Sequence, residues 1–114
     1  MDPTAAYERR AELTFIDVRK AYEWEAGHVE GSVHITLQEL PQRFAEVATD
    51  KPIVVVCQIG QRSALATDFL RAQGRDAHNL EGGVERWVRE GLPLVSAERG
   101  PGEIVDGWAE TLEW

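Results

Sequence analysis

The amino-acid sequence predicts an α/β fold, with a mostly parallel central sheet of four or five short strands and helices on both of its faces. Two apolar runs rich in β-branched residues, 14–18 (TFIDV) and 53–57 (IVVVC), have the composition of strands that are buried on both sides. Helical patterns alternate with the strand candidates along the chain. That alternation is typical of parallel strands joined by helices.

Weaker strand candidates accompany these two central ones. Residues 33–35 form one, and residues 77–80 form another after the turn signal at Gly74. Helices are predicted at residues 4–12, 20–25, 41–48, 62–73 and 83–90. The clearest of them is 62–73, whose apolar residues lie four positions apart on the face that we expect to be buried: Leu65 with Phe69, and Ala66 with Leu70.

The length of 114 residues is that of one ordinary domain. We expect a compact domain at residues 1–95. Residues 96–114 differ in composition, because small and charged residues are followed by an acidic segment that contains Trp108 and Trp114. We interpret residues 96–114 as an acidic C-terminal tail appended to the domain.

The charge of the chain argues against two classes of partner. Its 12 basic and 20 acidic residues give a formal net charge of -8, which repels nucleic-acid phosphates and anionic membrane surfaces. No apolar run approaches the length of a membrane span, and the first residues lack the basic and apolar regions of a signal peptide. The sequence therefore predicts a cytoplasmic protein that binds neither nucleic acid nor membranes.

A single cysteine, Cys57, limits the thiol chemistry of the chain. It excludes an internal disulfide and a cysteine-rich metal site. His28, His34 and His78 show no helical spacing of four residues with one another or with Cys57, so no metal site is predicted. Cys57 is then either an inert buried thiol or a reactive one, and its position in the chain has to decide.

Cys57 stands where a predicted central strand gives way to a short loop and a helix. Ligands of open α/β sheets bind at the carboxyl ends of the strands, and N–H groups of the loop and of the first helical turn favour negative charge. Gly60 supplies the backbone freedom that a tightly curved loop needs. We therefore expect an accessible, nucleophilic thiol, and the alternative is a small apolar residue that ends a buried strand.

The other loop residues are candidates for binding the substrate: Gln58, Ile59, Gly60, Gln61, Arg62 and Ser63. Arg62 is always charged, and we expect it to attract an anionic substrate, although a plain surface role is the alternative. Ser63 is suited to satisfy N–H groups at the start of the helix, and a second hypothesis is that its hydroxyl also touches the bound substrate.

The loop Cys57-x-x-Gly60-x-Arg62-Ser63 resembles the active-site loop of single-domain rhodanese proteins. Further stretches agree with that family in the expected order: residues 16–19 with 22–24, residues 27–33, and residues 80–87 followed by 91–93. The resemblance implies a thiosulfate sulfurtransferase of the rhodanese type. Such an enzyme takes sulfane sulfur from a donor such as thiosulfate, carries it as a persulfide on Cys57 and passes it to cyanide or a thiol. The resemblance implies no cofactor and no metal.

Several residues near the loop are expected to have structural roles. Asp17 and Arg19 are predicted to fix the turn after their strand through charge-assisted hydrogen bonds. We expect His28 to be a satisfied turn residue rather than a general base, because a preformed thiolate needs no obligatory proton acceptor. Gly82 and Gly83 are expected to let the backbone pass close to the site.

The chain departs from the family pattern in a few places. Glu30 stands where proline is usual, Ser32 where alanine is usual and His34 where asparagine is common. Little sequence precedes residue 14 for the family's usual first strand. We therefore expect the sheet to lack that edge strand.

Two other functions compete with a sulfurtransferase. Phosphatases and arsenate reductases of related architecture have one more residue in the loop, whereas only four residues separate Cys57 from Arg62. The smaller loop suits a sulfur atom better than a phosphate group. The stronger alternative is a rhodanese-like binding or regulatory module, or a dedicated sulfur carrier to a protein acceptor, with weak thiosulfate activity. An acidic protein with Arg62 alone at the loop gives a thiosulfate dianion little attraction.

Overall fold

The computed structural model describes residues 1–98 and 100–105, and over these residues the chain forms one sheet of four strands. The strands lie in the order β2-β1-β3-β4, and each neighbouring pair is parallel. Their bounds are β1 (Thr14–Asp17), β2 (Val33–His34), β3 (Ile53–Val56) and β4 (Ala77–Asn79). The predicted α/β fold with a parallel sheet is confirmed.

Helices connect these strands and cover both faces of the sheet. They are α1 (Pro3–Glu8), η1 (Arg10–Glu12), α2 (Ala21–Ala26), α3 (Leu40–Arg43), η2 (Phe44–Glu46), α4 (Gln61–Ala72) and α5 (Gly83–Arg89), where η marks a 3-10 helix. The described chain ahead of β1 is helical, as expected for a sheet without the extra edge strand. Over the residues that the structure describes, no helix is both long enough and apolar enough to span a bilayer.

Two of the predicted helices are each divided into an α-helix and a 3-10 turn. The first begins at Pro3, where the carboxylate of Asp2 accepts from the N–H of Ala5 at 3.1 Å and caps the helix. It ends early because Arg9, at φ -101° and ψ 13°, leaves the helical region. The segment predicted at 41–48 likewise changes from α3 to the 3-10 turn η2 after Arg43, and it ends where Val47 is extended, with φ -86° and ψ 129°.

The central strand β3 is buried on both faces because its side chains alternate between two cores. Ile53 and Val55 point into the core formed with α3 and α4, and the side chain of Cys57 belongs to the same core. Val54 and Val56 point into the core formed with α1 and α5. Alternation in a strand covered by helices on both sides explains why this run contains no polar residue.

One prediction about α4 was wrong. Leu65 was expected on the buried face, but it is 56% exposed. The face that packs on the sheet holds Ser63, Ala66, Thr67 and Leu70, which are all buried. Two of these four residues are polar, so an apolar pattern alone placed the buried stripe incorrectly.

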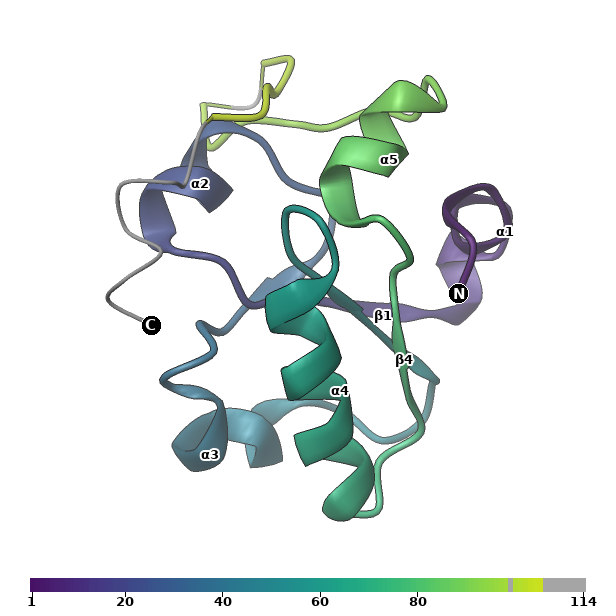
Figure 1. Cartoon of the computed structure of the whole chain (residues 1–114), viewed down its shortest axis with the longest axis vertical. Coiled ribbons are helices and arrows are strands. Elements are labelled where there is room, and N and C mark those ends of the chain that lie inside the picture. The colour runs from purple at the N-terminus through teal and green to yellow at the C-terminus, as the bar shows by residue number, and fades with distance from the viewer. Residues whose placement is uncertain (99, 106–114) are drawn as a thin grey trace.

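The boundary after residue 95 remains a prediction, and hydrogen bonds to the domain continue beyond it. The N–H of Glu103 donates to the carbonyl of Ala26 at 2.9 Å, which holds this segment beside α2 (Figure 1). A Cβ on Gly27 would lie 2.4 Å from the Glu103 carbonyl oxygen, so the two backbones are in close contact. Two tryptophans of the predicted tail, Trp108 and Trp114, lie outside the described residues.

Candidate active site

Cys57 directly follows β3, at the edge of the sheet where the parallel strands end. The N–H of Val18 donates to the carbonyl of Val56 at 3.0 Å, and the N–H of Leu80 donates to the carbonyl of Val55 at 2.9 Å. Backbone pairing therefore continues past the ends of β1 and β4 on both sides of Cys57. This is the position at which open α/β sheets bind their ligands.

The loop that follows Cys57 curls around its side chain. The N–H of Gly60 donates to Sγ at 3.1 Å, and the hydroxyl oxygen of Ser63 lies 3.2 Å from Sγ. Gly60 has a φ of +103°, in the left-handed region that glycine adopts readily. That conformation directs its N–H back toward the sulfur atom, and Gly60 is also the N-cap of α4. The sulfur thus faces two groups that can stabilise a negative charge.

The thiol is buried, and the expectation of an accessible thiol was wrong. Cys57 is only 1% exposed, because the loop closes over it and its side chain packs in the core with α4. The hollow beside Arg62, which Val18 and Thr36 also line, has a volume of about 10 Å³. That volume is close to the space of a single water-sized sphere. It is too small for thiosulfate, and Cys57 is not among the residues that line it.

The start of α5 holds the other side of the loop. The N–H of Val84 donates to the carbonyl of Cys57 at 2.9 Å, and the N–H of Glu85 donates to the carbonyl of Gln58 at 3.0 Å. The side-chain amide of Gln58 also donates to the Glu85 carboxylate at 2.8 Å. Because α5 engages these two carbonyls, the loop turns an N–H rather than a carbonyl toward Sγ.

The absence of a side chain at Gly83 allows α5 to approach the loop this closely. Gly82 and Gly83 have φ values of +75° and +61°. A Cβ on Gly83 would lie 2.3 Å from the carbonyl oxygen of Gln58 and 2.5 Å from that of Cys57. A side chain at position 83 is therefore excluded unless the loop shifts.

Arg62 does not face open solvent as a single cation. Its two terminal nitrogens donate to the two carboxylate oxygens of Glu23, each at 2.9 Å. Glu23 is fully buried on α2, and the Arg62 side chain is 13% exposed. Burial lowers the pKa of the Arg62 guanidinium, but the hydrogen bonds and charge of Glu23, with Cys57 and Asp17, outweigh it and raise that pKa. Attraction of an anionic donor by Arg62 stays a prediction, and it has to act in competition with Glu23.

The residues expected to be structural form a second buried pair and a ring stack. Arg19 donates to both carboxylate oxygens of Asp17, at 2.7 Å for the shortest bond, and also to the carbonyl of Gly27 at 2.6 Å. His28 stacks on Trp24 with ring centroids 3.5 Å apart, and its Nδ1 lies 2.7 Å from the Trp24 carbonyl oxygen. Their assignment as structural rather than catalytic residues stays a prediction.

The six loop residues predicted to bind substrate fall into three pairs. Gly60 and Ser63 reach the sulfur atom, and Gln58 and Arg62 are tied to acidic residues on neighbouring helices. The remaining two face solvent, Ile59 with 49% of its surface exposed and Gln61 at the start of α4.

Two residues of the site were missed by the sequence analysis. Glu23 had been noted only as part of a family motif, yet it is the partner of Arg62. Asn79, the last residue of β4, donates to the carbonyl of Gly60 at 3.1 Å and accepts from the hydroxyl of Ser63. A polar residue at the carboxyl end of a strand next to β3 was the signal that could have identified Asn79.

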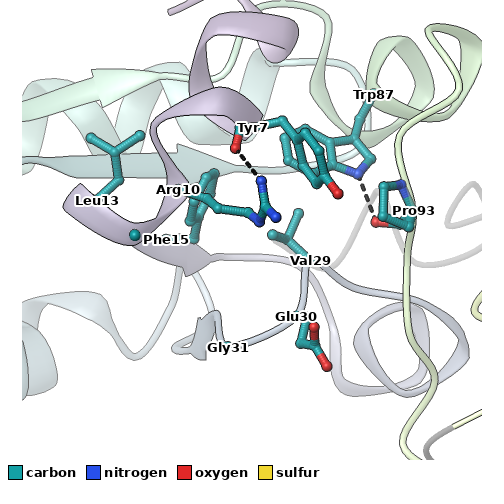
Figure 2. A pocket seen from close by; sticks show the side chains of 10 residues that line it. Tyr7, Arg10, Leu13, Phe15, Val29, Glu30, Gly31, Trp87 and Pro93 are labelled. Atoms are coloured by element: carbon teal, nitrogen blue, oxygen red, sulfur yellow. Dashed lines mark hydrogen bonds between the residues drawn. The ribbon is translucent and has the colours of Figure 1, made fainter.

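Among residues 1–98 and 100–105, histidine, cysteine, aspartate and glutamate side chains do not gather in threes at a candidate metal site. A larger cavity of about 410 Å³ lies on the α1 and α5 side of the sheet, away from the core that contains Cys57. Figure 2 shows its walls, where Arg10 lies over the ring of Tyr7 at 4.0 Å and donates to the Tyr7 carbonyl at 2.8 Å. None of its lining residues belongs to the cysteine loop.

Comparison with known proteins agrees with this geometry. An uncharacterized protein of Bacillus subtilis, YqhL, is 44% identical over 80 residues, which is 69% of this chain and 62% of that protein. A sulfurtransferase of Allochromatium vinosum is 32% identical over 88 residues, 76% of this chain and 82% of that one. The crystal structure of a rhodanese-related protein from Thermoplasma volcanium has a TM-score of 0.81 and 34% identity, covering 83% of this chain and 95% of that chain. A family model described as "Rhodanese-like domain" matches residues 2–90, and the chain therefore belongs to the rhodanese-like domain family.

Proposed function

We propose that this protein is a sulfurtransferase that carries sulfane sulfur as a persulfide on Cys57, taken from a donor such as thiosulfate. The observation that carries the proposal is the pair of groups on Sγ, the Gly60 N–H at 3.1 Å and the Ser63 hydroxyl at 3.2 Å. Both can donate to a thiolate, and a thiolate is the nucleophile that such a reaction requires. The sulfurtransferase among the relatives supports the same class of reaction.

In the loading step, the Cys57 thiolate attacks the outer sulfur of thiosulfate. A new S–S bond forms to Sγ, the S–S bond of thiosulfate breaks, and sulfite leaves with the electron pair of that bond. The persulfide anion that results carries its charge on the outer sulfur. The charge of the reactants, -3, is the charge of the products, so no external oxidant or reductant is needed.

In the discharge step, a nucleophile takes the outer sulfur and regenerates the thiolate. Cyanide gives thiocyanate, and a thiol gives a new persulfide. The chain has one cysteine, so no second thiol of this chain can resolve the persulfide. The acceptor is therefore external, and the cycle is of the ping-pong type.

A dedicated carrier that delivers sulfur to a protein acceptor is the second candidate, and two observations favour it. Ile59 places an exposed apolar side chain two residues from the nucleophile, where a docking protein would touch it. Arg62 is paired with Glu23 in a chain of net charge -8, which weakens the attraction for a free dianion. A protein persulfide as donor, or a protein thiol as acceptor, does not need that attraction.

Intact-protein mass spectrometry tests both candidates in one experiment. The protein is incubated with thiosulfate or with a small organic persulfide, the donor is removed, and the mass is measured with Cys57→Ser as the matched control. A one-sulfur adduct with thiosulfate, lost on addition of cyanide, supports the sulfurtransferase. An adduct with the persulfide alone supports the carrier. Absence of an adduct with every donor would contradict both proposals.

A further inference from the structure

Asn79 holds the two loop residues that contact the sulfur atom. It is the last residue of β4 and lies opposite Val55 of β3, next to the strand end that leads into Cys57. Its Nδ2 donates to the carbonyl of Gly60 at 3.1 Å, and its Oδ1 accepts from the hydroxyl of Ser63. Gly60 and Ser63 are the residues whose N–H and hydroxyl face Sγ.

The orientation of the Asn79 amide follows from its partner on the loop. The carbonyl of Gly60 can only accept, so the NH₂ group of Asn79 must face it, and an inverted amide would bring two oxygens together. Oδ1 is then the atom that faces Ser63. The Ser63 hydroxyl has one proton and two acceptors within reach, Oδ1 of Asn79 and Sγ of Cys57.

The state of the sulfur decides where that proton goes. A thiol can donate its own proton to the Ser63 oxygen, and the Ser63 hydroxyl then keeps its hydrogen bond to Oδ1 of Asn79. A thiolate can only accept, so the hydroxyl has to rotate toward Sγ and give up Oδ1. Ser63 is fully buried, and a neighbouring acceptor therefore has a strong effect on the hydroxyl.

We propose that Asn79 is a positioning residue of the sulfur site, which anchors the loop at Gly60 and competes with Sγ for the proton of the Ser63 hydroxyl. This inference rests on the proposed function for its purpose, because it concerns how easily the nucleophilic thiolate forms. Its geometry is independent of which donor or acceptor the protein uses.

The charged groups at this end of the sheet stay constant in the test. They are Asp17 at the end of β1, Glu23 on α2, Arg62 on α4 and Glu85 on α5. The variants to be compared change only Asn79 and Ser63. Differences among them therefore report the hydrogen bonds and not these charges.

The test is a thermodynamic cycle of wild type, Asn79→Ala, Ser63→Ala and the double variant. The midpoint of thiolate formation is followed by ultraviolet absorbance as the pH is raised, with Cys57→Ser as the blank. Asn79→Ala frees the Ser63 hydroxyl for the sulfur, which lowers the midpoint, and releases the Gly60 carbonyl, which raises it. Only the first effect needs Ser63, so the midpoint in Asn79→Ala should lie about half to one pH unit lower, relative to its parent, in the wild-type background than in the Ser63→Ala background. Equal shifts in the two backgrounds, or no shift in either, would overturn the proposal.

Asn79→Asp provides a second variant of the same size, for the case that Asn79→Ala does not fold. Its carboxylate keeps an acceptor toward Ser63, cannot donate to Gly60 and adds a negative charge near the sulfur, so the midpoint should rise. The charge acts in both backgrounds, and the part of the rise that is lost in the Ser63→Ala background reports the hydrogen bond to Ser63. Cooperative thermal unfolding is the fold control for each protein. The proposed function is tested separately, because sulfur uptake is measured on the wild type. A wild type that takes up no sulfur would refute the proposed function. The thermodynamic cycle of variants would still measure the competition between Asn79 and Sγ for the hydroxyl proton.

Discussion

Gly83→Ala should destabilise the protein because it adds a backbone conformational cost and a steric cost at the contact between α5 and the cysteine loop. The φ of +61° at Gly83 is unfavourable for a residue with a side chain, at about 1–2 kcal/mol. The new Cβ would lie 2.3 Å from the Gln58 carbonyl oxygen and 2.5 Å from the Cys57 carbonyl oxygen. Relief of that overlap by backbone movement costs about 1–3 kcal/mol more. The free energy of unfolding should therefore fall by about 2–5 kcal/mol.

Gly91→Ala is the matched control, because Gly91 has a φ of +81° and a Cβ there would meet no atom within 4 Å. It should show the conformational cost alone, about 1–2 kcal/mol. Both are measured by equilibrium urea unfolding, and sulfur loading is measured on the folded variants. Loading should slow more in Gly83→Ala, since the shift displaces the residue that carries the nucleophile. Equal losses of stability in the two variants would refute the argument that the loop is packed tightly against α5.

Three further predictions concern other parts of the site and its surroundings. Glu23→Gln removes the carboxylate that pairs with the Arg62 guanidinium, which is 13% exposed. The free energy of unfolding should fall by roughly 2–4 kcal/mol, which is less than for a fully buried ion pair because Arg62 is partly exposed. A loss under about 1 kcal/mol would mean that the pair behaves like a surface ion pair. Hydrogen bonds from the Thr36 N–H and, to a lesser extent, from its hydroxyl lower the pKa of Glu39. Thr36→Ala removes only the hydroxyl, so it should raise that pKa part of the way to its ordinary value. Because a depressed carboxylate pKa gives stability that is lost as the pH falls through it, the variant should also lose less stability on acidification, with NMR titration as the check. Cys57→Ser should keep the stability within about 1 kcal/mol and form no sulfur adduct, and an adduct on that variant would place the sulfur elsewhere.

The strands were predictable because their signal is local. An unbroken apolar run can be satisfied only by burial on both faces, and β3 alternates between two cores as that pattern requires. The buried face of α4 was not predicted correctly, since it includes Ser63 and Thr67. The Thr67 hydroxyl donates to the carbonyl of Ser63 within the helix, whereas the Ser63 hydroxyl donates to the side chain of Asn79 on β4. Local apolar patterns do not show which polar residues will find such partners.

The site was predictable in its nucleophile and less so in its surroundings. The loop motif located Cys57 and the contacts from Gly60 and Ser63, because they lie within seven consecutive residues. Glu23 and Asn79 lie 34 positions before and 22 positions after Cys57 in the numbering. They meet the loop only because the parallel sheet brings the ends of β1, β3 and β4 to one edge. Register and helix placement decide such meetings, and one sequence does not specify either in advance.

Charge balance at the site bears on what it can bind. Arg62 is matched by Glu23 and Arg19 by Asp17, so each buried cation has its own carboxylate and the two pairs add no net charge. The groups that donate to Sγ are dipoles, the Gly60 N–H and the Ser63 hydroxyl. Two donors of this kind suit the single charge of a thiolate. A phosphate dianion would need more donors and an unpaired cation, and releasing Arg62 for that purpose would leave Glu23 buried and uncompensated. The balance of charges therefore favours sulfur transfer over phosphate hydrolysis, independently of the length of the loop.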